Sequence, residues 1–170
     1  MLRRMHLADW LSLAVSGSSV IVAIVALAQT RKTNRAQQRV AVLLPRLQAY
    51  DSAVAIGRQL EHTAKIRFLA KVGSDEVEVA HAATGSTKPN HFATAYETYS
   101  QELRHQADLL EALSEQSYFP NDFSRAMRSL LAAAMVRNDV SAEVVDGQWK
   151  EIKANFQHLQ AVHTDSTTLK

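Results

Sequence analysis

Two Glu-x-x-His pairs are the residues of this chain whose types and spacing could best support chemistry. Glu78 precedes His81 by three positions, and Glu102 precedes His105 by the same interval. Residues three apart share one face of a helix, and bundles that bind two metal ions take one such pair from each of two helices. In the helix expected over residues 91–117, however, His105 points ~130° away from the apolar face and towards water. We therefore expect no metal site.

Other catalytic motifs are absent or incomplete. Gly85-Ser86-Thr87-Lys88 echoes a phosphate-binding loop, but no glycine stands upstream at the required spacing and no strand is expected before it. The chain also contains no Gly-x-Ser-x-Gly, Ser-x-x-Lys or His-Glu-x-x-His motif. We interpret His163, which falls on an apolar helix face, as a packing histidine. The chain is therefore predicted not to be an enzyme and to hold no cofactor.

An uncharged run of 21 residues, Trp10 to Thr30, is the element that most restricts the function. As a helix it spans about 30 Å, the thickness of a bilayer's hydrocarbon core. A cleaved signal peptide is the alternative, since Ala26-Leu27-Ala28 is a possible cleavage site. The run exceeds a usual signal core, and cations follow it at once, as they follow a membrane helix. We predict an uncleaved single-pass anchor.

The segment after this run is basic, with Arg31, Lys32, Arg35 and Arg39. These residues are predicted to stop the span, and they can contact anionic lipid headgroups. Because they outnumber the cations before the span, the C-terminal side is favoured as cytoplasmic, at a bacterial-type inner membrane. Residues 1–39 hold six of the nineteen Lys/Arg and one of the seventeen Asp/Glu, so they carry +5 and the rest carries −3. The remainder therefore lacks the basic character that nucleic-acid binding needs.

Small residues recur along one side of the predicted span at alternating intervals of four and three. Small side chains let membrane helices approach closely, and serine hydroxyls can hydrogen-bond between helices. This spacing predicts a self-association face and a homo-oligomer. The face comprises Ser12, Ser16, Ser19, Ala23 and Ala26.

The rest of the chain reads as helix, because glycine and proline are scarce and apolar residues recur three and four apart. Pro45 is expected to kink or interrupt the first helix, and Gly73-Ser74 to end it. The last helix carries a regular apolar seam, which predicts lengthwise packing in a bundle. Further helices are expected over 75–83, 91–117, 121–138 and 141–163, and the seam comprises Val145, Trp149, Ile152, Phe156, Leu159 and His163.

The predicted fold class is all-α, with a single N-terminal transmembrane helix followed by an up-and-down bundle of about four helices. The domain boundaries are a tail at 1–9, the span at 10–30, a basic juxtamembrane helix at 31–45, the bundle at 46–164 and a disordered tail at 165–170. The leading functional hypothesis is a non-catalytic, membrane-anchored interaction module whose protein partner the sequence does not identify. A membrane-anchored sensory or ligand-binding bundle, or an oligomeric membrane-perturbing effector, remains open.

Overall fold

The computed structural model describes residues 7–116, 119–136 and 141–168, and it gives the backbone alone at residues 7–25, 28, 36, 42 and 166–168. Across these ranges the chain is helical and forms no strand. The prediction of an all-α chain with about four helices is confirmed. The helices are α1 (Leu7–Thr84), α2 (His91–Ser114), α3 (Asn121–Met135) and α4 (Ala142–Thr168).

Helix α1 is a single element of 78 residues that contains Pro45, so of the kink or interruption expected there, the interruption is wrong. The predicted end at Gly73-Ser74 and the separate helix over 75–83 are wrong as well. Pro45 removes one backbone donor, which leaves the carbonyl of Ala41 without its usual partner. Ala41 and Pro45 are both exposed, so solvent can reach that carbonyl. The residues on either side of Pro45 favour the helical conformation strongly enough for the helix to continue past the proline.

Contacts from α2 explain why α1 continues past Gly73. A Cβ atom at Gly73 would lie 2.7 Å from Cδ1 of Phe92, so the aromatic ring occupies the space that a side chain would take. Asn90 caps α2 by accepting hydrogen bonds from the backbone N–H groups of Phe92 and Ala93. Its side-chain amide donates to the carbonyl and hydroxyl oxygens of Ser74. Gly73-Ser74 is thus a docking point for the next helix rather than a stop.

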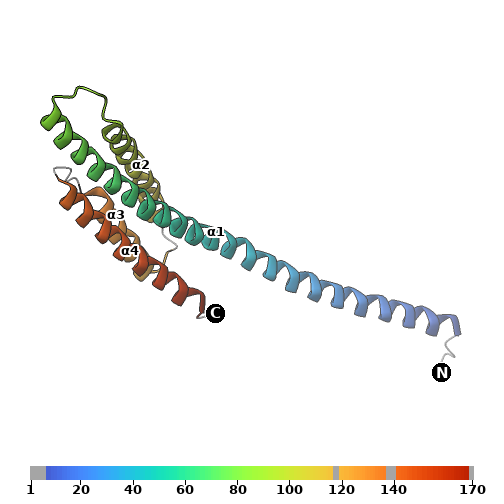
Figure 1. Ribbon diagram of the computed structural model, residues 1–170. Coiled ribbons are helices and arrows are strands. Elements are labelled where there is room, and N and C mark those ends of the chain that lie inside the picture. Colours follow the sequence, from blue (N-terminus) through green and yellow to red (C-terminus); the bar gives the residue numbers. More distant parts are fainter. Residues whose placement is uncertain (1–6, 117–118, 137–140, 169–170) are drawn as a thin grey trace. The chain divides into compact units, whose positions relative to one another are not determined.

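The chain divides into two compact units, Met1–Pro45 and Arg46–Lys170. In the second unit the later part of α1 packs with α2, α3 and α4, as Figure 1 shows. Arg67 contacts Tyr96 whereas Thr63 contacts Gln106, so α1 and α2 run antiparallel. Arg67 also contacts Gln148, and a Cβ at Gly57 would touch Phe156, so α1 and α4 are antiparallel as well. Phe123 of α3 lies near His163 of α4, whereas Gln148 of α4 contacts Val136 after α3, so α3 and α4 also run antiparallel. The four helices thus alternate in direction, as in an up-and-down bundle.

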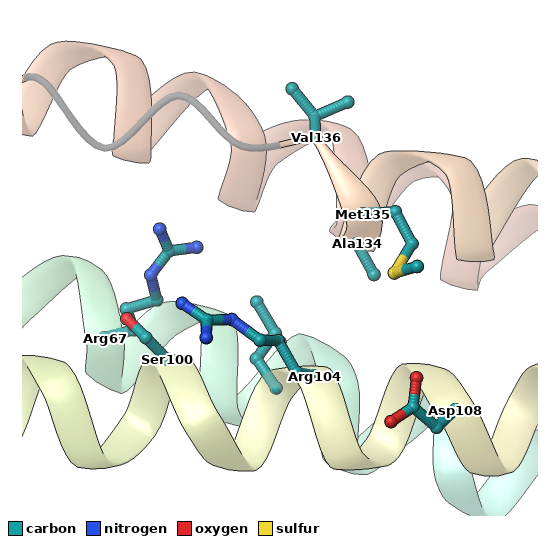
Figure 2. A pocket seen from close by; sticks show the side chains of 8 residues that line it. Arg67, Ser100, Arg104, Asp108, Ala134, Met135 and Val136 are labelled. Carbon is teal, nitrogen blue, oxygen red and sulfur yellow. The ribbon is translucent and has the colours of Figure 1, made fainter.

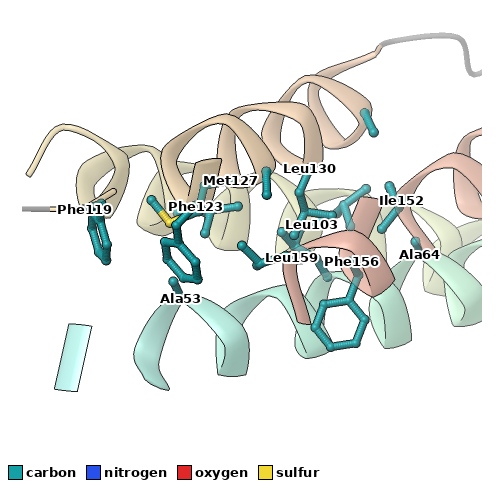
Figure 3. Packing of buried hydrophobic residues seen from close by; sticks show 14 of the residues in the cluster. Ala53, Ala64, Leu103, Phe119, Phe123, Met127, Leu130, Ile152, Phe156 and Leu159 are labelled. Carbon is teal, nitrogen blue, oxygen red and sulfur yellow. The ribbon is translucent and has the colours of Figure 1, made fainter. Parts of the chain in front are cut away.

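The bundle core is built from alanine, leucine and phenylalanine side chains of all four helices (Figure 3). The seam predicted on α4 is largely confirmed, because Val145, Ile152, Phe156 and Leu159 are buried. Trp149 is half-buried, and it stacks on Phe68 of α1 with ring centroids 6.0 Å apart.

The predicted termini differ from the helix bounds. Helix α1 begins inside the predicted tail at 1–9, and α4 runs to Thr168, inside the predicted tail at 165–170. Where side chains are described, no helix has a stretch long and apolar enough to cross a membrane. Residues 10–25 of the predicted span lie outside those described side chains.

Candidate functional site

The two Glu-x-x-His pairs lie on the surface of the bundle. Glu102 and His105 are exposed on α2, which confirms that His105 faces away from the core. Glu78 is exposed and His81 is half-buried near the end of α1. The Glu102 carboxylate accepts a hydrogen bond from Nε2 of Gln106 at 2.8 Å. Within the described part of the chain, no three His, Cys, Asp or Glu residues come together in a way that could hold a metal ion.

The predicted self-association face lies on α1, but only its last residue has a described side chain. Ala26 is exposed, whereas Ser12, Ser16, Ser19 and Ala23 lie outside the described side chains. The interaction predicted for this face is therefore still a prediction.

The four cations after the predicted span, Arg31, Lys32, Arg35 and Arg39, are all exposed on α1. Exposed apolar side chains occur on the same stretch of helix. Large apolar residues on a helix surface mark a surface that another molecule can cover. They are Leu27 (56% exposed), Val40 (58%), Leu43 (41%), Leu44 (51%) and Leu47 (38%).

Arg67 is the most informative polar residue of the bundle interior, and it is only 5% exposed. Its guanidinium donates to Oε1 of Gln148 and to the hydroxyl of Tyr96, each at 3.2 Å. Nε2 of Gln148 in turn donates to the carbonyl of Val136 at 2.8 Å. This chain of hydrogen bonds links α1, α2 and α4 with the residue that follows α3. Charge-assisted hydrogen bonds of this kind hold helices in one register.

Arg67 belongs to none of the sites predicted from the sequence, although the sequence carries a signal for its burial. Ala53, Gly57, Leu60, Ala64 and Arg67 follow each other at alternating intervals of four and three, and all five are buried. A charged residue on such a line is directed into the core by the same periodicity that directs the apolar ones. Helical spacing alone could therefore have indicated a buried arginine.

A second buried polar link joins α1 and α2. Nε2 of Gln106 donates to Oγ1 of Thr63 at 3.1 Å as well as to Glu102. Gln106 is 4% exposed and Thr63 is 6% exposed. The hydrogen bond from Gln106 to Thr63 ties α2 to α1, which is a structural role.

A pocket of about 170 Å³ lies beside Arg67, between α1, α2 and the end of α3 (Figure 2). Its polar lining comes from Arg67, Ser100, Arg104 and Asp108. Its apolar lining comes from Leu103, Ala134, Met135 and Val136. A cavity of this size accepts a small organic molecule, since one of ~150 Å³ holds benzene.

His163 lies at the opposite end of the bundle, in an aromatic cluster. Its ring stacks on Tyr50 with centroids 6.0 Å apart, and its Nε2 lies 3.6 Å from Oδ1 of Asp51. Tyr50 also makes edge contacts with Phe119 and Phe123. Burial raises the pKa of the Tyr50 phenol above its usual value. These contacts support the interpretation of His163 as a packing histidine.

Comparison of this chain with models of protein families, with curated proteins and with solved structures found no match. The function of this chain is therefore inferred from its own residues and geometry.

Proposed function

We propose that this chain is a non-catalytic interaction module that is anchored in a membrane by one helix and self-associates. One observation carries the proposal. The uncharged run Trp10–Thr30 lies within the unbroken helix α1, and exposed cations follow it directly. Such a run is long enough to cross a bilayer, and cations at its end anchor it at the headgroups. The excess of cations on its C-terminal side favours a cytoplasmic bundle.

The bundle interior supports a binding role over a catalytic one. The buried polar side chains of Arg67, Gln148, Thr63 and Gln106 hydrogen-bond across the helix contacts. Groups used in this way fix the packing of a bundle and are not poised to move protons or attack a substrate. A bundle of fixed shape is suited to present its surface to a partner protein.

A ligand-binding bundle is the second candidate, and the pocket beside Arg67 favours it. Both Arg104 and Asp108 line this pocket and are exposed, so the pocket opens to solvent on the side of α2. A small molecule that raises the melting temperature of the wild type but not of Arg104→Gln would favour this function over the first.

Membrane fractionation tests the anchor. The full-length chain is expected to remain in the membrane pellet after carbonate and high-salt washes, because a helical span is held by burial of its apolar surface. Replacing both Val20 and Val22 with arginine should release the chain, since each charge at the centre of a span costs ~3 kcal/mol.

The matched control is Val40→Arg with Leu44→Arg, which places the same two charges on α1 outside the predicted span and should leave the chain in the pellet. Wild-type protein in the supernatant, or a mature chain that begins at Gln29, would contradict the anchor.

A further inference from the structure

Val40 and Leu44 are exposed apolar residues of α1 beyond the predicted span, and they fall on a regular helical spacing. The self-association face predicted up to Ala26 alternates intervals of four and three. The same alternation continues without a change of phase along α1, which is one unbroken helix. The continued positions within the unit Met1–Pro45 are Thr30, Thr33, Gln37, Val40 and Leu44, called here the α1 seam, and all are exposed.

This spacing identifies the type of contact. A seven-residue repeat keeps one face of a helix turned towards a partner helix of the same pitch, which is the geometry of a left-handed coiled coil. Val40 and Leu44 supply the large apolar side chains that such a contact buries. The hydroxyls of Thr30 and Thr33 donate to the carbonyls of Ala26 and Gln29 at 2.8 and 2.9 Å. Their polar atoms are therefore satisfied within α1, and a partner can cover them.

The positions of the cations on α1 indicate which partner can bind the α1 seam. Arg31, Lys32, Arg35 and Arg39 all fall outside the α1 seam and outside the two positions that flank it in the heptad. A second copy of this helix can therefore approach the seam without bringing its own cations against these. The cations lie roughly opposite the seam, so an anionic lipid surface that attracts them would leave the apolar residues uncovered.

We propose that the α1 seam binds the same seam of a second copy of this chain, as a parallel, in-register coiled coil. The parallel orientation rests on the proposed function, because two copies anchored with the same topology present their helices in the same direction. At a rise of ~1.5 Å per residue, Val40 lies about 15 Å beyond Thr30, so the apolar contact extends past the hydrocarbon core.

Single cysteines test this contact cleanly, because the chain contains no native cysteine. Thr33→Cys, Val40→Cys and Leu44→Cys are expected to form disulfide-linked dimers under mild oxidation in membranes. In a parallel, in-register pair each seam residue meets its own copy, within the reach of a disulfide. The matched controls are Gln38→Cys and Arg39→Cys, which lie on the outward face and should remain monomeric.

Two outcomes would overturn the proposal. Equal cross-linking at the seam and control positions would exclude a specific face, and cross-linking at one seam position alone would indicate an antiparallel or crossed contact. Membrane fractionation of the same variants distinguishes failure of the α1 seam from failure of the anchor. Protein in the pellet without seam cross-links refutes the α1 seam and keeps the anchor, whereas protein in the supernatant refutes the anchor.

A second variant measures the contact without cysteine chemistry. Val40→Glu with Leu44→Glu should raise the dissociation constant of the dimer in neutral detergent about tenfold or more, because it places like charges in the seam. Gln38→Glu with Arg39→Glu is the control and should leave the dimer intact. Equal dissociation constants for the two double variants would overturn the α1 seam.

Discussion

Replacing Phe156 with alanine is expected to lower the free energy of unfolding by ~3–5 kcal/mol, a large share of the stability of a small domain. Phe156 is 4% exposed and belongs to the core cluster. Its ring packs against Gly57 of α1, where no side chain can move in to fill the cavity left behind. Thermal unfolding of the full-length chain in neutral detergent, followed by circular dichroism, measures the loss.

Two further variants control this measurement. His105→Ala should leave the melting temperature nearly unchanged, with or without added metal, because His105 is exposed. Trp149→Ala should cost less than Phe156→Ala, since Trp149 is only half-buried. A melting temperature for Phe156→Ala equal to that of the wild type would contradict the packing. Loss of a stoichiometric bound metal in His105→Ala would revive the dimetal interpretation.

Gly57→Leu is expected to destabilise the bundle by about 3 kcal/mol or more, through overpacking. A Cβ atom at Gly57 would lie 2.9 Å from Cδ2 of Phe156 and 3.0 Å from Cδ2 of Leu130. Both neighbours are in the closely packed core, so α1 would have to move away from α3 and α4. Denaturant unfolding of the full-length variant in neutral detergent measures this effect.

Gly147 on α4 is the matched control, because a Cβ there would meet nothing within 4 Å. Gly147→Leu removes a flexible helical glycine without a steric cost, so it should stabilise the protein by ~0.5–1 kcal/mol. If Gly57→Leu and Gly147→Leu had the same effect, close approach of α1 to α3 and α4 would be excluded.

Local periodicity was sufficient to predict α2, α3 and α4 and much of the core, but not the extent of α1. The spacing of Val145, Ile152, Phe156 and Leu159 places one stripe of α4 in the core, because a helix turns by a constant angle per residue. The helix expected from residue 91 begins there in the structure, where the side chain of Asn90 satisfies free backbone N–H groups. The outward direction of His105 followed from the same helical geometry.

What the sequence by itself determined is thus the all-helical class, the start of α2 and the buried stripe of α4, because each depends on interactions within one helix. Tertiary structure alone decided that α1 continues past Gly73, where Phe92 fills the space above the glycine. It also decided that Arg67 links helices and that Trp149 packs at the edge of the core, where it stacks on Phe68. Those outcomes depend on which side chains of distant segments meet, and the free energy of such contacts outweighs the local preference of one glycine or one tryptophan.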